Sequence, residues 1–198
     1  RDSALGVIEL KRCTSSVHNG IRQNLDNQKD AFIPHFFTTM QFLFAGNDTE
    51  GLYYGVIDTP EKFWLRWKES NSKEKNELDR STLQVFDKER ILELIHDFII
   101  FDGGRKKACR PNQFFGIKAA QPRARNKESG IIWHSQGSGK SLTMVWLARW
   151  IHENIDDARV VIITDRDELD KQIENAFKNA GEEVKRAKSG YQLIGMLN

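Results

Sequence analysis

IIWHSQGSGKSLTMVWLARWI, residues 131–151, is the stretch of sequence that decides the fold. Its centre sets Gly137 and Gly139 around a serine and continues directly into Lys140 and Ser141. Glycines let the backbone approach a ligand closely, and amide groups at a helix N-terminus converge on phosphate oxygens. Lys140 can reach the β- and γ-phosphates of a nucleotide, and Ser141 can offer its hydroxyl to Mg²⁺. The stretch therefore predicts a phosphate-binding loop.

The residues around this loop supply the context that it requires, a strand before it and a helix after it. Residues 130–134 are predicted to form the strand and residues 141–153 the helix. His134 occupies the place of the outer glycine of the general pattern, a position that mainly shapes the entry to the loop. The alternative is a glycine-rich turn with a surface lysine. The candidate ATP-binding residues of the loop are Gln136, Gly137, Ser138, Gly139, Lys140 and Ser141.

A second strand and a second helix are predicted after the loop. The unbroken apolar run Val160–Ile163, within residues 159–165, is typical of a parallel strand buried on both faces. Residues 167–179 are predicted to form a helix, with Asp165 and Glu168 as a capping box. The predicted core stripe of this helix consists of Leu169, Ile173 and Phe177. The alternation of strands and helices predicts a βαβα unit and an α/β fold.

Near the N-terminus, VIELK at residues 7–11 lies within a strand predicted for residues 1–12. The period of two places Glu9 and Lys11 side by side on one face of that strand. A carboxylate there can bind a hard cation such as Mg²⁺, and an ammonium can position water or stabilise a pentavalent phosphate. The alternative is an exposed salt-bridging face, which strands commonly carry. The spacing alone leaves both interpretations open.

The part of the chain between these two motifs is predicted to alternate between helices and strands. Strands are expected at residues 38–45 and 51–57 around a hairpin loop, and helices at residues 20–32, from Pro60, from Asp87 to a stop at Gly103 and Gly104, and at residues 111–124. Residues 70–80 are expected to form a linker or an exposed loop. The aromatic side chains of this part are expected in the core rather than as platforms for base stacking, and they are Phe36, Phe37, Phe42, Phe44, Tyr53, Tyr54, Trp64 and Trp67.

Composition sets broad limits on the function. The net charge of +2 is too small to indicate nucleic-acid binding by itself. Cys13 and Cys109 are far apart and in no metal-binding spacing, which fits free thiols in a reducing compartment. No apolar run is long enough to span a bilayer, so we expect a cytoplasmic protein. The chain begins with Arg1 rather than Met, and we expect it to be a fragment of something longer.

WHSQGSGKSLTM, followed by VVIITDRDELDKQI, closely resembles the first two helicase motifs of the type I restriction enzyme motor (R) subunit. A histidine at the position of His134 is characteristic of that family. The resemblance implies that Thr164 and Arg166 contact a DNA backbone, where the alternative is ordinary solvation at a loop end. RPNQFFGIKAAQ resembles the segment in which a glutamine reads the adenine edge. The resemblance thus makes Arg110 and Gln113 candidates for nucleotide-base binding, with an ordinary polar pair at a helix start as the alternative.

The same family carries a Glu-x-Lys pair in a nuclease core before its motor, followed by a helix with a glutamine. The resemblance implies that Glu9, Lys11 and Gln23 are catalytic, with Glu9 as a metal ligand. Asn27 replaces the tyrosine that is usual in the family. We expect the partner aspartate of the nuclease, and the DExx-type carboxylates that serve ATP hydrolysis, to lie outside this chain.

The resemblance implies an α/β chain with part of a restriction-endonuclease-like (PD-(D/E)xK) mixed sheet, followed by the first βαβα of a RecA-like domain. The expected divisions are 1–69 for the end of the endonuclease-like domain, 70–104 for a linker and connecting helix, and 105–198 for the start of the ATPase or translocase domain.

The implied function is ATP-dependent translocation of duplex DNA coupled to its Mg²⁺-dependent cleavage. The implied partners are duplex DNA and the methyltransferase and specificity subunits of the same complex, and no membrane association is expected. We expect the fragment alone to be inactive. The alternatives are a superfamily 2 helicase or translocase without nuclease activity, and a nucleotide-sensing scaffold with no DNA role.

Overall fold

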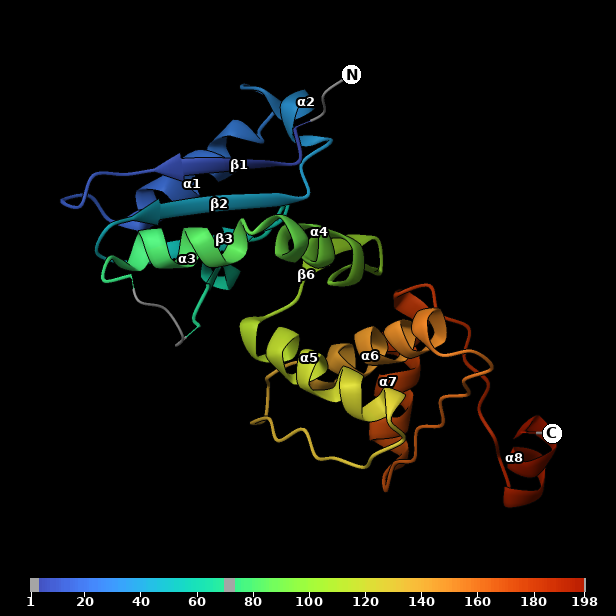
Figure 1. Cartoon of the computed structure of the whole chain (residues 1–198). Coiled ribbons are helices and arrows are strands. Elements are labelled where there is room, and N and C mark those ends of the chain that lie inside the picture. The colour runs from blue at the N-terminus through green and yellow to red at the C-terminus, as the bar shows by residue number, and fades with distance from the viewer. Residues whose placement is uncertain (1–3, 70–73, 198) are drawn as a thin grey trace. The chain divides into compact units, whose positions relative to one another are not determined.

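Four strands build the sheet of the N-terminal half in this computed structural model, which describes residues 4–69 and 74–197. Their order is β1-β2-β3-β4, with bounds Gly6–Leu10, Phe42–Asn47, Gly51–Gly55 and Leu65–Arg66. β1 pairs with β2 in parallel, whereas β2 with β3 and β3 with β4 are antiparallel. The sheet is therefore mixed, as the resemblance implies (Figure 1). β1 lies at its edge and contains the residues VIEL of the VIELK segment, with Lys11 directly after its end. The strand is shorter than the expected residues 1–12, of which residues 1–3 lie outside the described part of the chain.

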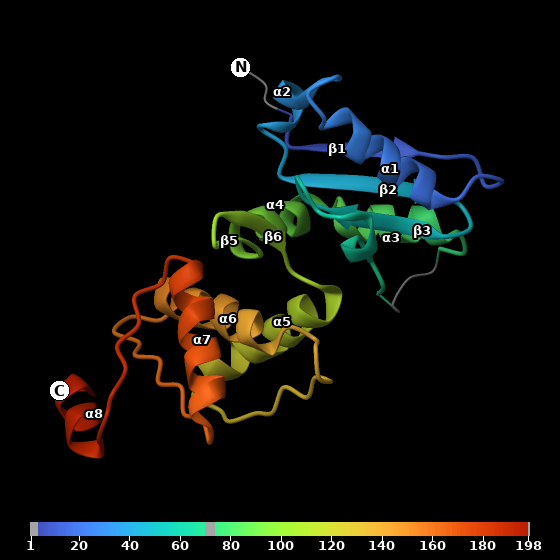
Figure 2. The same cartoon turned by 180° about the vertical axis from the view of Figure 1, so that it is seen from behind.

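Helices cover both faces of this sheet. α1 (Val17–Asn27) lies on one face and α3 (Glu77–Val85) on the other, as the two opposite views show (Figures 1 and 2). The core under α1 consists of Val17, Ile21, Phe37, Met40, Leu43, Ala45 and Trp64. On the α3 side, Phe44 packs against Phe86 with ring centroids 4.7 Å apart. The aromatic residues expected in the core are buried or half-buried except Phe36, on the short helix α2 (Pro34–Phe37), which is exposed.

The prediction of a helix from Pro60 is wrong. A single turn, η1 (Glu61–Phe63), is followed by extended backbone at Trp64 and by β4, which pairs with β3. The buried Trp64 indole donates a 3.0 Å hydrogen bond to the Thr59 carbonyl. Pairing with β3 and burial of this ring outweigh the local helical pattern, because tertiary packing commonly overrides weak propensity.

Two helix starts also differ from expectation because side chains cap them earlier. α1 begins at Val17 rather than at residue 20, since the Ser16 hydroxyl accepts from the His18 amide, and it ends at Asn27. α3 begins inside the loop expected for residues 70–80, because Asn76 caps it by accepting from the Leu78 and Asp79 amides. Residues 70–73 of that expected loop lie outside the described part of the chain.

The helix expected from Asp87 to Gly103 ends early. Asp87 caps α4 (Lys88–Asp97) as predicted, by accepting from the Arg90 amide, but a hairpin of β5 (Ile99–Asp102) and β6 (Arg105–Ala108) follows. Gly103 and Gly104 form its two-residue loop with φ of 58° and 80°. Positive φ at both positions is what a tight hairpin turn demands, and it favours glycine. The glycine pair turns a hairpin rather than ending a helix.

The chain divides into two compact units, one of residues 1–100 and 106–111 and the other of residues 101–105 and 112–198. In the second unit, α5 (Pro111–Arg125), α6 (Lys140–Asn154) and α7 (Asp167–Asn179) pack together, whereas α8 (Gly190–Leu197) stands apart from them (Figure 2). The three packed helices match the predicted ones closely. Of the helices that the structure describes, none is both long and apolar enough for a membrane span.

The two strands expected around α6 are absent from the described residues. Residues 130–134 and 159–165 join no sheet there, and Ile131, Trp133 and Ile163 are 87% to 90% exposed. A strand persists only where a neighbouring strand takes its backbone hydrogen bonds. No described segment of the second unit does so, and the expected βαβα unit is reduced to its helices.

The capping box expected at α7 is wrong as well. The N-cap is Arg166, and among the described side chains none caps it by a hydrogen bond. The first turn is instead held from outside, since Arg186 reaches Asp170 at 2.6 Å and Asp167 at 3.3 Å. Of the predicted core stripe, Ile173 and Phe177 are buried, whereas Leu169 is exposed and the prediction is wrong there.

Candidate functional site

Glu9 and Lys11 lie side by side near the end of β1, as the period of the strand predicts. The Lys11 ammonium is 2.9 Å from a carboxylate oxygen of Glu9, and both side chains are about three-quarters buried, with 25% and 22% exposed. The pair is less exposed than an ordinary surface ion pair, but it keeps access to solvent.

Gln23 of α1 completes this cluster. Its side-chain oxygen accepts a 2.5 Å hydrogen bond from the Lys11 ammonium. The close approach of α1 to the sheet depends on Gly20, where an added Cβ would lie 3.2 Å from the Glu9 carbonyl and 3.3 Å from the Ala45 Cβ. The three residues that the sequence singles out therefore meet, although they come from a strand and a helix. We call Glu9, Lys11 and Gln23 the β1–α1 cluster.

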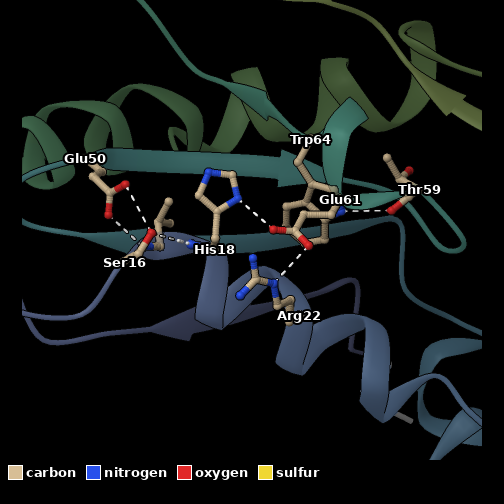
Figure 3. Close-up of polar contacts among 8 residues, drawn as sticks. Ser16, His18, Arg22, Glu50, Thr59, Glu61 and Trp64 are labelled. Atoms are coloured by element: carbon tan, nitrogen blue, oxygen red, sulfur yellow. Dashed lines mark hydrogen bonds and ion pairs between the residues drawn. The ribbon is translucent and has the colours of Figure 1, made fainter.

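The N-terminus of α1 is fixed by the loop between β2 and β3. The Glu50 carboxylate accepts from the Val17 amide at 2.7 Å and from the Asn47 side chain at 2.7 Å. Figure 3 shows the Ser16 hydroxyl beside the same carboxylate. The hydrogen bond from the Val17 amide is the largest cause that lowers the pKa of Glu50. An ionised Glu50 thus caps α1 at the end where the helix dipole favours negative charge.

A second carboxylate holds the side of α1 farther along the helix. Glu61 of η1 lies 3.0 Å from Nδ1 of His18 and accepts a 3.0 Å hydrogen bond from Nε of Arg22 (Figure 3). The Arg22 hydrogen bond is the main reason that the pKa of Glu61 is lowered. The sequence does not point to Glu50 or Glu61, because their partners on α1 are 33 to 43 residues away.

The predicted phosphate-binding loop has the backbone that its glycines permit. Gly137 and Gly139 have φ of 76° and 84°, and α6 begins at Lys140, so its first amide groups face the loop. The Lys140 ammonium donates to the carbonyl oxygens of His134 at 3.2 Å and Ser135 at 3.0 Å. This arrangement can receive phosphate oxygens, because the ammonium and the helix N-terminus supply positive charge at one place.

The other loop residues of the predicted set surround that point. Gln136 is exposed and Ser141 is half-buried in the first turn of α6. Ser138 is buried, and its hydroxyl has no hydrogen-bond partner among the described residues. A buried hydroxyl without a partner costs free energy, so an acceptor brought to the loop by a ligand fits this position.

Gln113 of α5 reaches the same loop. Its side-chain amide donates a 2.8 Å hydrogen bond to the Gly139 carbonyl, and an added Cβ at Gly139 would lie 2.5 Å from that nitrogen. The structure thus brings Gln113 to the phosphate-binding loop. Arg110 belongs to the first unit and is exposed, and its role stays a prediction.

The two residues predicted to contact DNA lie just before α7. Thr164 is half-buried, and the Arg166 side chain is largely exposed, 3.7 Å from the Asp165 carboxylate. Both positions are accessible enough to meet a partner, and their role stays a prediction.

Cys13 and Cys109 are both free thiols, Cys13 exposed and Cys109 buried, and burial raises the pKa of Cys109.

Two family models match the chain in separate parts. The model of the type I restriction enzyme R protein N terminus matches residues 2–62, which contain the β1–α1 cluster. The SWI2/SNF2 ATPase model matches residues 112–198, which contain the phosphate-binding loop. The two motifs thus lie in two different matched regions.

Curated relatives match along most of the chain. The "Putative type I restriction enzyme MjaVIIIP endonuclease subunit" of Methanocaldococcus jannaschii is 30% identical over 96% of this chain and 20% of its own length. The "Putative type I restriction enzyme MjaIXP endonuclease subunit" of the same organism is 35% identical over 57% of this chain and 12% of its own length. The "Type I restriction enzyme SauCOLORF180P endonuclease subunit" of Staphylococcus aureus is 24% identical over 96% of this chain and 21% of its own length.

The chain thus spans about a fifth or less of the length of these relatives. Within that span the order of the matches is the order of the two motifs, with the R protein N terminus first and the ATPase second. The chain belongs to the type I restriction enzyme R protein family, as a part of such a subunit.

Proposed function

We propose that the chain is the part of an R subunit in which the end of a nuclease domain meets the start of an ATP-driven motor. In this proposal the first unit has a restriction-endonuclease-like (PD-(D/E)xK) core and the second begins a RecA-like domain. The whole subunit translocates duplex DNA and cuts it, in a complex with methyltransferase and specificity subunits. The observation that carries the proposal is the meeting of Glu9, Lys11 and Gln23 beside β1.

The phosphate-binding loop is proposed to bind ATP with Mg²⁺. Lys140 exchanges its contacts with the loop carbonyls for phosphate oxygens, and the amide groups at the start of α6 donate to the same phosphates. Ser141 offers a hydroxyl to the metal ion. The positive φ of Gly137 and Gly139 supports this assignment, because side chains there would strain the loop.

The β1–α1 cluster is proposed to serve phosphodiester cleavage. Glu9 supplies one carboxylate to Mg²⁺, and Lys11 positions the attacking water or stabilises the charge that develops on the phosphate. Gln23 holds the Lys11 ammonium in place through its side-chain oxygen. One carboxylate is too few for a hard cation, which takes several oxygen ligands, so further ligands complete this site.

The experiment compares Glu9→Gln with the unaltered full-length subunit in its complex. Cleavage of unmodified duplex DNA should be lost, whereas ATP hydrolysis stimulated by DNA should continue. Lys29→Gln on the same unit serves as the control, because Lys29 pairs with the nearby Asp26 at an exposed position. Undiminished cleavage by Glu9→Gln would remove the nuclease assignment and leave a translocase without nuclease activity.

ATP hydrolysis by the full-length subunit does not by itself distinguish a motor from a nucleotide sensor. The hydrolysis rate is therefore measured with and without duplex DNA. A rate that rises with DNA supports the motor, and a rate indifferent to DNA supports a nucleotide-sensing scaffold.

A further inference from the structure

We propose that His134 is a positioning residue for the phosphate-binding loop, and that its ring is seated against α5 in the space left by Gly116. The inference rests on the proposed binding of ATP at this loop and adds a role that the glycine usual at this position could not have. The ring fixes the entry of the loop, and Gln113 fixes its exit.

The first observation concerns Gly116, which lies inside α5. Glycine in a helix interior destabilises the helix relative to alanine, so its presence calls for a reason. A Cβ at Gly116 would lie 3.3 Å from both Cε1 and Nε2 of His134. Contacts that short are tighter than ordinary van der Waals packing. The absent side chain at Gly116 therefore makes room for the imidazole ring.

The second observation is that the same helix holds the loop at two places. Gln113 lies three residues before Gly116, so both are on one face of α5. Gln113 donates to the carbonyl of Gly139, where the loop ends, and Gly116 receives the ring of His134, where the loop begins. Helix α5 thus sets the separation between the two ends of the loop.

The third observation concerns Lys140. Its ammonium donates to the carbonyl oxygens of His134 and Ser135. When the Lys140 ammonium turns to bind phosphate, the start of the loop loses these two hydrogen bonds. The His134 ring does not depend on Lys140, so its packing on Gly116 keeps the entry in place while the lysine changes partners.

The contact is steric rather than polar. Nδ1 of His134 is buried, and no described residue provides it with a hydrogen-bond partner. A planar ring without that nitrogen should therefore serve, whereas a short side chain should not. This distinguishes packing of the ring from any hydrogen bonding or proton transfer by the imidazole.

The test measures ATP hydrolysis by the full-length subunit in its complex with duplex DNA. His134→Ala should raise KM for ATP about tenfold, which corresponds to about 1.4 kcal/mol of binding, with kcat nearly unchanged. His134→Phe should restore KM to within about threefold of the natural value. An unchanged KM for His134→Ala, or a His134→Phe variant as defective as His134→Ala, would overturn the inference.

Gly116→Ala supplies an independent arm, in case loss of the ring disturbs folding. The added methyl group should displace the ring and raise KM, and Gly116→Ala combined with His134→Ala should be no worse than His134→Ala alone. The control is Gly195→Ala, where a Cβ meets no described atom within 4 Å. Additive effects in the double variant would contradict a direct contact between the two positions.

Lys140→Ala separates this inference from the proposed function. If the unaltered subunit binds ATP and Lys140→Ala does not, the loop is the nucleotide site, and the His134 variants decide the inference by themselves. If Lys140→Ala binds ATP as tightly as the unaltered subunit, the proposed site fails, and the inference about His134 fails with it.

Discussion

The Lys11 ammonium donates to the side-chain oxygen of Gln23, 2.5 Å away, while it also contacts Glu9 on its own strand. A lysine carries a flexible stem, and holding its charge at one point has an entropic cost. Two acceptors from different elements offset that cost. The helix α1 is thus a part of the proposed nuclease site, because the position of Gln23 fixes where the lysine points.

Replacement of Gln23 by alanine should therefore weaken DNA cleavage without abolishing it. A hydrogen bond to a charged group contributes about 1.5–3 kcal/mol, so the rate should fall roughly tenfold or more. DNA-stimulated ATP hydrolysis should not change. Gln172→Ala, at an exposed position of α7, is the matched control. Equal cleavage by the Gln23 and Gln172 variants would show that Lys11 needs no help from α1.

Gly20→Ala should act on the same site through the backbone. The added methyl group would meet the Glu9 carbonyl at 3.2 Å and push α1 away from β1. Overpacking of this kind typically costs about 1–3 kcal/mol, so denaturant unfolding should begin at a lower concentration, and cleavage should fall with it. Gly195→Ala in α8 meets no described atom within 4 Å and should leave both quantities unchanged or slightly improved. A Gly20→Ala variant of normal stability would argue against the close approach.

The features that the sequence predicts well are those with local signals. Asp87 caps α4 as expected, β1 falls within the predicted strand, and the helices α5, α6 and α7 have nearly the predicted bounds. Helix caps and apolar periods depend on residues within a few positions of one another, so the pattern is legible in the chain itself. The β1–α1 cluster was also within reach, but only through the resemblance to a family.

The features that the sequence predicts badly depend on distant partners. The apolar run Val160–Ile163 looks like a buried strand, yet no described strand pairs with it. Trp64 ends a helical pattern because β4 pairs with β3. Glu50 contacts the Val17 amide 33 residues away, and no spacing along the chain marks such a contact. Strand pairing and tertiary contacts decide these cases. Both join residues that are far apart in the sequence, so no local pattern predicts them.

Acid should weaken the anchoring of α1 through Glu50. The pKa of this carboxyl is lowered in the folded state from 4.5, so its contribution to stability is present above 4.5 and is lost as the pH falls through the folded value. Glu50→Gln should lower the free energy of unfolding by roughly 1 kcal/mol at neutral pH, as lost helix caps do. The difference from the natural chain should shrink below pH 4.5. Glu183→Gln, at a largely exposed position, is the control. If the difference in the free energy of unfolding between Glu50→Gln and the natural chain were the same at every pH, the ionic cap would be contradicted.

Lys140→Met should weaken ATP binding by the full-length subunit about 10- to 100-fold, the equivalent of roughly 1.5–3 kcal/mol for a hydrogen bond to a charged group. The thermal midpoint should change little, because the loop carbonyls that Lys140 contacts remain near solvent. Titration with a fluorescent ATP analogue measures the affinity. Lys171→Met, at an exposed position of α7, provides the comparison, and equal affinities for the two variants would exclude Lys140 from the nucleotide site.

Alkaline pH should destabilise the first unit through Tyr54, whose hydroxyl donates a 2.7 Å hydrogen bond to the Cys109 carbonyl. Burial raises the pKa of Tyr54 well above 10.0 and the pKa of Cys109 above 9.0. A raised pKa contributes stability that is fully present below the unfolded value and is lost as the pH rises through the folded one. The free energy of unfolding should therefore be level from neutral pH to about pH 9 and should fall beyond it.

Tyr54→Phe isolates the tyrosine part of that fall. At neutral pH the variant should be about 1–3 kcal/mol less stable, because the Cys109 carbonyl loses its donor. Above pH 10.0 its stability should decline less steeply than that of the natural chain, since one of the two titrating groups is gone. Tyr191→Phe, at a position 90% exposed, should follow the natural chain throughout. Denaturant unfolding at a series of pH values measures all three, and parallel curves for Tyr54→Phe and the natural chain would show that Tyr54 does not titrate with unfolding.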